Sequence, residues 1–90
     1  MKTYSVYVLW STKLKKRYTG CTEDVENRVQ EHNAGKQRST RGGIPWTLIY
    51  IESYNSLSEA RKREIYLKSR SGRRLLDKLN FDLERCESGC

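Results

Sequence analysis

Two strand-like runs separated by a short basic turn constrain the fold more than any other feature of this chain. Residues 3–11 alternate and are rich in Tyr, Val, Leu and Trp, a pattern typical of a strand, and residues 17–21 form a shorter second run. The turn between them carries Lys13, Lys15 and Lys16. Because a short connection suits antiparallel strands, we expect the two runs to pair as a hairpin.

A polar helix is expected next. Thr22 is its predicted N-cap, Glu23 and Asp24 suit the positive end of the helix dipole, and Gly35 is expected to end it. Residues 36–45 are predicted to form a loop, because glycines and a proline break regular structure there. This loop has no acidic residue, and its cations are Lys36, Arg38 and Arg41.

The second half of the chain predicts one more strand and two helices. Residues 46–54 are the clearest strand, and the Ser-Leu-Ser-Glu stretch that begins at Ser56 is a capping box for a helix to about Lys68. A break is expected over Ser69–Gly72, followed by a short helix over 73–80. Residues 81–90 are expected to form a flexible acidic tail.

Charge and cysteine content narrow the class of protein. The net charge of +7 predicts attraction to polyanions, of which nucleic acid is the commonest. Ninety residues make one domain. Three cysteines without framework spacing argue against a secreted disulfide fold, so we expect a cytoplasmic, reduced protein. No signal peptide or apolar stretch of membrane length is present, so no membrane partner is expected.

Two ionisable residues share the predicted buried face of the first helix. At 100° per residue, Arg28 and His32 lie on the same stripe as Val25 and Val29. Each could be an ordinary residue at the edge of the core that snorkels or pairs with a carboxylate. Because buried charge is rare, an Arg and a His one turn apart on this stripe favour a functional role.

Glu64 is the only acid on the apolar stripe of the next long helix, which also contains Leu57, Ala60 and Leu67. A carboxylate there is costly unless it is paired or binds a metal ion. One interpretation is an ion pair with Arg28. The other is a ligand for a hard cation, since a single carboxylate with waters and a substrate phosphate is a normal Mg²⁺ arrangement.

Each of the first two strands carries a tyrosine with two possible roles. Tyr7 falls on the face opposite Val6 and Val8, and Tyr18 lies two residues before Gly20, where backbone or substrate could approach closely. Cross-strand packing would explain each ring. Alternatively, hydroxyls near a cation could carry protons.

These residues occur in a distinctive order, and the chain resembles the GIY-YIG endonuclease family, most closely its small single-domain branch. The resemblance covers roughly residues 3–70. It departs from the naming motifs at three positions, with Ser5 in place of Gly, Val6 in place of Ile, and Thr19 in the middle of the second motif. The residues that carry it are Ser5-Val6-Tyr7, Tyr18-Thr19-Gly20, Arg28, His32 and Glu64.

The resemblance implies an α+β fold over residues 1–80, in which helices flank a small three-stranded antiparallel sheet. It also implies a divalent-metal-dependent endonuclease that uses one Mg²⁺ or Mn²⁺ ion, with DNA as the expected substrate. By position, Glu64 corresponds to the family's metal-binding glutamate. The residues that correspond to its catalytic positions are Tyr7, Tyr18, Arg28 and His32.

Basic residues outside this set are expected to hold the phosphate backbone without reading bases. They are Lys13, Lys15, Lys16, Lys36, Arg38 and Arg41. A lone nuclease module has no obvious element for target choice, so a protein partner could supply specificity. Two other functions stay open: a non-catalytic module that keeps the fold and binds nucleic acid, and a protein–protein adaptor. The presence of all five site residues favours an enzyme.

Overall fold

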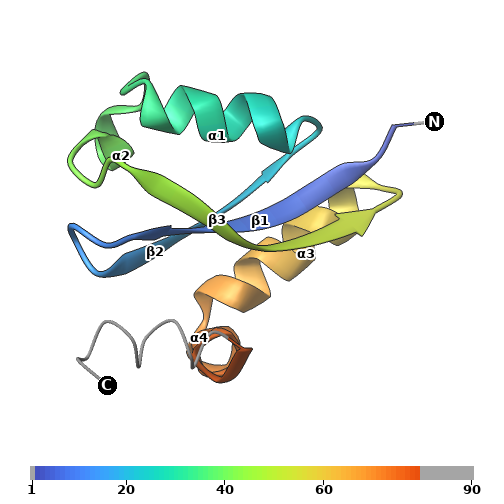
Figure 1. Cartoon of the computed structure of the whole chain (residues 1–90). Coiled ribbons are helices and arrows are strands. Elements are labelled where there is room, and N and C mark those ends of the chain that lie inside the picture. The colour runs from blue at the N-terminus through green and yellow to red at the C-terminus, as the bar shows by residue number, and fades with distance from the viewer. Residues whose placement is uncertain (1, 80–90) are drawn as a thin grey trace.

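In the computed structural model, which describes residues 2–79, helices cover both faces of a twisted sheet (Figure 1). The sheet is antiparallel with strand order β2-β1-β3, so β1 is the central strand. This confirms the predicted α+β class and three-stranded sheet. The predicted tail over 81–90 lies outside the described residues. In chain order the elements are β1 (Tyr4–Ser11), β2 (Lys16–Thr22), α1 (Val25–Asn33), α2 (Arg38–Arg41), β3 (Trp46–Tyr54), α3 (Leu57–Lys68) and α4 (Arg70–Leu79).

The alternation of β1 divides the core into two layers, one on each face of the sheet. On one face Val6 and Val8 pack with Ala60 and Leu67 of α3 and with Leu76 of α4. On the other face, beneath α1, a second cluster is formed by Tyr7, Leu9 and Trp46, with Tyr18, Val25, Val29 and Ile44 packed against it. The two tyrosines of the motifs therefore point toward α1, as the alternation predicts.

The ends of α1 differ in part from the prediction. Asp24 is the N-cap, and its carboxylate accepts a hydrogen bond from the backbone N–H of Asn27 at 3.1 Å. The prediction that Thr22 is the N-cap is wrong, because this residue still pairs with Ser5 in the sheet. Gly35 follows the C-cap with a φ of +79°, which confirms its predicted role as the helix stop.

Two other predictions, which took glycine or proline as a break in secondary structure, differ from the structure. The stretch 36–45 contains the single helical turn α2, which is too short to produce a periodic pattern. Only Ser69 separates α3 from α4, so the expected break over Ser69–Gly72 is limited to its first residue and α4 begins at Arg70, before the predicted start at 73. Gly72 lies inside α4, where a Cβ would come within 2.1 Å of the Tyr66 carbonyl oxygen. This glycine therefore permits close packing of α4 on α3 and does not interrupt the helix.

A half-buried carboxylate links α3 to the sheet. Glu52 of β3 accepts hydrogen bonds from Nε and Nη2 of Arg63 at 2.9 and 3.1 Å, and also from the hydroxyls of Tyr50 and Tyr54. Burial opposes ionisation, but these hydrogen bonds hold the pKa of Glu52 below its usual value. Because successive helical residues differ by 100°, the neighbouring Glu64 points to a different side of α3. None of the helices in the described part of the chain is long and apolar enough to cross a membrane.

Candidate active site

A pocket of about 200 Å³ lies at the β2 edge of the sheet and is lined by residues from both faces of the sheet. Its lining residues are Tyr7, Tyr18, Gly20, Cys21, Arg28, Leu57, Arg61 and Glu64. Four of the five residues predicted for the site, Tyr7, Tyr18, Arg28 and Glu64, are thus brought together. They come from β1, β2, α1 and α3 respectively. The fifth, His32, is fully buried and lies behind Tyr7.

The strand register creates the space for Tyr7. Gly20 is the direct partner of Tyr7 in β2, and a Cβ at this position would lie 2.5 Å from the tyrosine hydroxyl oxygen. Tyr18 stands on the same face, with its ring centroid 6.3 Å from that of Tyr7. The Tyr-Thr-Gly motif therefore places one tyrosine beside the pocket and removes the side chain that would obstruct the other.

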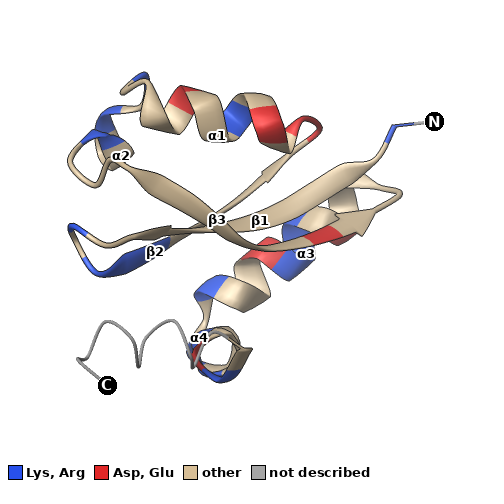
Figure 2. Ribbon diagram, viewed as in Figure 1, with Lys and Arg blue, Asp and Glu red and all other residues tan. Residues whose placement is uncertain are grey.

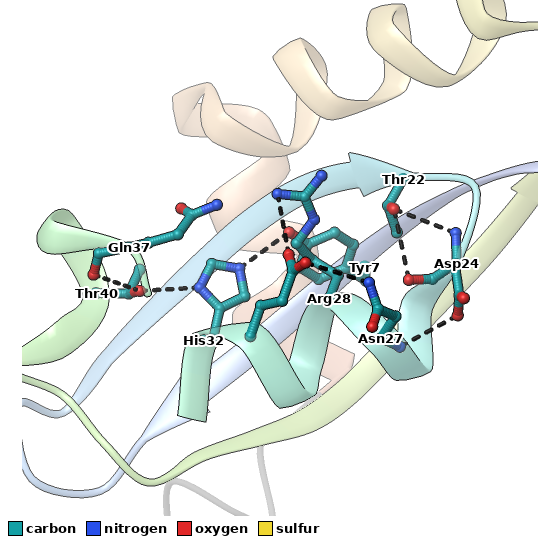
Figure 3. Close-up of polar contacts among 9 residues, drawn as sticks. Tyr7, Thr22, Asp24, Asn27, Arg28, His32, Gln37 and Thr40 are labelled. Atoms are coloured by element: carbon teal, nitrogen blue, oxygen red, sulfur yellow. Dashed lines mark hydrogen bonds and ion pairs between the residues drawn. The ribbon is translucent and has the colours of Figure 1, made fainter. Parts of the chain in front are cut away.

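A chain of buried polar contacts extends from Tyr7 away from the pocket (Figure 3). The Tyr7 hydroxyl lies 3.1 Å from Nε2 of His32, and Nδ1 of His32 lies 2.9 Å from the Thr40 hydroxyl. The Thr40 hydroxyl also reaches the backbone carbonyl of Gln37 at 3.5 Å. Sequence reasoning missed Thr40, because a contact between α1 and a single helical turn such as α2 has no periodic signal.

Electrostatics keeps both ends of the tyrosine–histidine pair neutral near neutral pH. Burial, together with the nearby Tyr18, raises the pKa of Tyr7 well above its usual value, although Arg28 opposes this. Burial and then the positive charge of Arg28 lower the pKa of His32. A neutral phenol thus contacts a neutral imidazole, an arrangement in which a proton can pass from one to the other.

Arg28 and Glu64 each pair with a neighbour on their own helix. Arg28 Nη1 lies 3.7 Å from Glu31 Oε1, and Lys68 Nζ lies 2.8 Å from Glu64 Oε2. The interpretation of Glu64 as an ion-pair partner of Arg28 is therefore wrong. The exposed fractions of the two side chains are 36% for Arg28 and 21% for Glu64, so both can contact a ligand in the pocket.

Glu64 fits a hard divalent cation that is held mainly by water and substrate. No group of three or more His, Cys, Asp or Glu side chains that could hold a metal ion occurs within residues 2–79, so these residues form no complete protein cage. Mg²⁺ commonly uses one or two carboxylates and keeps several waters or phosphate oxygens as ligands. Lys68 contacts Oε2 of Glu64, and Oε1 is not engaged by residues 2–79.

A second and larger cleft of about 540 Å³ adjoins the pocket, and Tyr18 lines both. Lys15 of the β1–β2 turn and Lys16 at the start of β2 line one part of it, and Lys68 and Arg73 line another. The cleft therefore places positive charge beside the candidate active site.

The other four predicted phosphate-binding cations line neither cavity, and one of them, Lys13, lies in the β1–β2 turn. Lys36, Arg38 and Arg41 belong to the segment around α2, and Figure 2 shows blue segments both there and at the β1–β2 turn. The Arg41 side chain donates from Nε to the Gly35 carbonyl at 3.1 Å, so it also supports the end of α1. The predicted cations thus form two groups, of which the turn group is next to the pocket.

Besides Gly20, three further lining residues were not in the predicted site. Leu57 was already on the predicted stripe of Glu64, and helical periodicity could also have placed Arg61, three residues before Glu64, on the same side of α3. Cys21 enters from the α3 side of β2, and its thiol pKa is raised by burial and by Glu64. A neutral thiol is a weak nucleophile, so Cys21 contributes shape to the pocket.

Comparison with known proteins agrees with this geometry. Residues 3–80 match the model of the GIY-YIG catalytic domain. A UPF0213 protein from Halobacterium salinarum is 53% identical over 55 residues, which cover 60% of this chain and 71% of the relative. A UPF0213 protein from Syntrophus aciditrophicus is 38% identical, over 89% of this chain and 93% of the relative.

A solved structure shows the same fold. The solution NMR structure of a UPF0213 protein from Bacillus halodurans is 35% identical, covers 86% of this chain and 84% of its own, and superposes with a TM-score of 0.53. The chain therefore belongs to the GIY-YIG family, whose members are typically nucleases. Its relatives belong to the UPF0213 group, and that designation states no activity.

Proposed function

We propose that this member of the GIY-YIG family is a divalent-metal-dependent endonuclease that hydrolyses phosphodiester bonds in DNA. The observation that carries the proposal is the pocket itself. It gathers two tyrosines, an arginine and a glutamate from four elements of the fold. Metal-assisted phosphoryl chemistry needs a base, a cation and a ligand for a Lewis acid, and these side chains supply each of them.

Tyr7 is the group that removes the proton from the attacking water. As the water proton moves to the Tyr7 oxygen, the phenol proton moves to Nε2 of His32, 3.1 Å away. The resulting hydroxide attacks phosphorus, the bond to the leaving oxygen breaks, and that oxygen takes a proton from solvent water. His32 has no exposed surface, so it receives the proton through Tyr7 and does not touch the water. The relay lets a phenol with a raised pKa act as a base without first becoming phenolate.

Arg28 and Glu64 act on the phosphate. Arg28 is charged and partly exposed in the pocket, where it stabilises negative charge on the phosphate oxygens. Glu64 would hold Mg²⁺ or Mn²⁺, which when bound supplies Lewis-acid stabilisation of a phosphate oxygen. Tyr18 packs edge-on against the His32 ring, with centroids 4.8 Å apart, and presents a second hydroxyl to the pocket.

Binding is electrostatic and blind to base sequence. The cleft beside Tyr18 carries lysine and arginine side chains on both of its walls, and such groups bind phosphates by releasing counterions. Because phosphate contacts carry no sequence information, the affinity for mixed oligonucleotides should be similar and should fall as salt rises.

Glu64→Gln tests the proposal, because glutamine keeps the shape but loses the charge that holds the cation. We expect cleavage with Mg²⁺ or Mn²⁺ to fall by roughly 10²-fold or more, which corresponds to the loss of several kcal/mol of transition-state stabilisation. DNA binding at low salt should stay largely unchanged. Glu59→Gln is the matched control on the same helix, since Glu59 does not line the pocket and glutamine also serves in a capping box.

Two results would overturn the assignment. If the Glu64→Gln protein cleaved DNA at the wild-type rate, Glu64 would be excluded as the metal ligand. A wild-type protein that binds DNA and RNA of varied structure but cuts none of them, and whose amide resonances around residues 7, 18, 28 and 64 do not respond to Mg²⁺, would instead be a non-catalytic binding module.

A further inference from the structure

We propose that Thr40 is a positioning residue that holds His32 in the tautomer with its proton on Nδ1. This inference rests on the proposed function, in which Nε2 of His32 must be free to accept the Tyr7 proton. Thr40 belongs to α2 and lies outside both the pocket and the motifs that carry the family resemblance.

The contacts form a chain of hydrogen bonds whose direction depends on the tautomer of His32 (Figure 3). The Thr40 hydroxyl has one hydrogen and lies close to the Gln37 carbonyl, at 3.5 Å, and to His32 Nδ1, at 2.9 Å. If that hydrogen goes to the carbonyl, which can only accept, then the hydroxyl oxygen accepts from Nδ1–H. Nε2 is then unprotonated and accepts from the Tyr7 hydroxyl.

The opposite direction leaves a buried donor without a protein partner. If Thr40 donated to Nδ1, the proton of His32 would lie on Nε2 and would be donated to Tyr7, and the Tyr7 hydrogen would need an acceptor elsewhere. Tyr7 is only 2% exposed, and among residues 2–79 His32 is the hydrogen-bond partner of its hydroxyl. The direction from Tyr7 to Thr40 is favoured, because it gives every hydrogen in this chain of contacts an acceptor within the protein and leaves the Tyr7 oxygen free to accept from a water in the pocket.

Thr40 is held in place independently of His32. It is fully buried, and its carbonyl accepts a hydrogen bond from Trp46 Nε1 at 2.7 Å. Trp46 is in turn fixed by Asn33, which accepts from the Trp46 backbone N–H at 2.6 Å. The hydroxyl therefore has a defined position when it meets the imidazole, as a positioning group requires.

The direct test is the tautomer of His32, and it needs no assay of activity. The chain contains one histidine, so ¹⁵N-histidine labelling gives one imidazole whose two nitrogens can be assigned by NMR. We expect the wild-type protein at pH 7.5 to carry the proton on Nδ1, with Nε2 unprotonated. A wild-type protein with its proton on Nε2 would overturn the proposal without any substitution.

Thr40→Val, Thr40→Ala and Thr40→Ser then link the hydroxyl to catalysis. Without the hydroxyl, Nδ1–H would have no acceptor, so in the Val and Ala variants we expect the Nε2–H tautomer, which can donate to Tyr7. We expect their kcat to fall by about tenfold or more, up to the roughly 10²–10⁴-fold that a general base contributes in full. Thr40→Ser keeps the hydroxyl and should restore both the Nδ1–H tautomer and a kcat within about twofold of wild type.

The same variants separate this inference from the proposed function. Folded Val and Ala variants that keep the wild-type tautomer, or that lose it but cleave at the wild-type rate, would overturn the role of Thr40. A wild-type protein that cuts no substrate would overturn the proposed function, and the tautomer would still decide whether Thr40 positions His32. The acid limb of the pH–rate profile should move in the Thr40→Val variant. The charged groups that face His32 are Arg28 and Glu31, and both are unchanged in this variant, so the movement would report the loss of the Thr40 hydroxyl.

Discussion

Gly20→Ala tests whether close contact between the two motifs positions the proposed base. The new Cβ would lie 2.5 Å from the Tyr7 hydroxyl oxygen and 2.6 Å from Cζ. Non-bonded carbon contacts are favourable near 3.5–4.0 Å, so the ring must move by about 1 Å. That movement would disrupt the 3.1 Å contact between the Tyr7 hydroxyl and His32 Nε2.

The expected loss of stability is small beside the expected loss of activity. Overpacking a well-packed site costs about 1–3 kcal/mol, and replacing glycine returns about 0.4–1 kcal/mol through the unfolded state. We therefore expect the free energy of unfolding to fall by about 1–2 kcal/mol. A misplacement of about 1 Å in an active site can cost roughly 10²-fold in rate, so cleavage should fall by about that factor while the protein stays folded.

The assay combines urea denaturation with cleavage measured where the variant is fully folded. Gly42→Ala is the matched control, because Gly42 has a helical φ of −71° and nothing lies within 4 Å of a Cβ built there. Its activity should equal that of the wild type. If Gly20→Ala cleaved as fast as the wild type and kept the Tyr7–His32 hydrogen bond in its NMR spectra, the steric argument would be refuted.

Two further predictions concern stability. Gly72→Ala would stabilise an ordinary helix by about 1 kcal/mol, but here the Cβ would lie 2.1 Å from a backbone oxygen, so we expect destabilisation of about 3 kcal/mol or more by urea denaturation. A neutral or stabilising effect would contradict the packing of α4 on α3. Burial, followed by Arg28, lowers the pKa of His32, so below pH 6.5 the unfolded state binds the extra proton. The contribution of His32 to the free energy of unfolding should be fully present above pH 6.5 and should decrease below it by up to about 1.4 kcal/mol per pH unit. The His32→Gln variant should not show this dependence of stability on pH.

The elements that could be predicted from the sequence are those with a long, regular pattern. The alternation in β1 and the capping box before α3 define elements of eight and twelve residues, and both are confirmed. Thr22 and Gly72 misled the prediction because each has a common local role that tertiary structure overrides. Thr22 is retained by the sheet as the partner of Ser5, and Gly72 is required by a helix–helix contact.

The site was predictable where one periodicity places residues on one face. A period of two puts Tyr7 and Tyr18 toward α1, and a period of 3.6 puts Arg28 on the stripe of Val25 and Val29. The partners of the ionisable groups were predictable only in part. Glu64 and Lys68 have the i,i+4 spacing of a helix ion pair, so their contact could have been predicted. The contact of His32 with Thr40 could not, because it depends on the placement of α2.

The edge position of β2 explains how one pocket can use both faces of the sheet. The two tyrosines belong to the α1 face, whereas Glu64 comes from α3 on the opposite face. A central strand would separate these groups, but β2 has a neighbour on one side only, so both can meet at its free edge. A slip of one residue in the β1–β2 register would turn Tyr18 toward α4 and remove Gly20 from Tyr7. The spacing of the two tyrosine motifs along the hairpin is therefore as important to the proposed chemistry as the residues themselves.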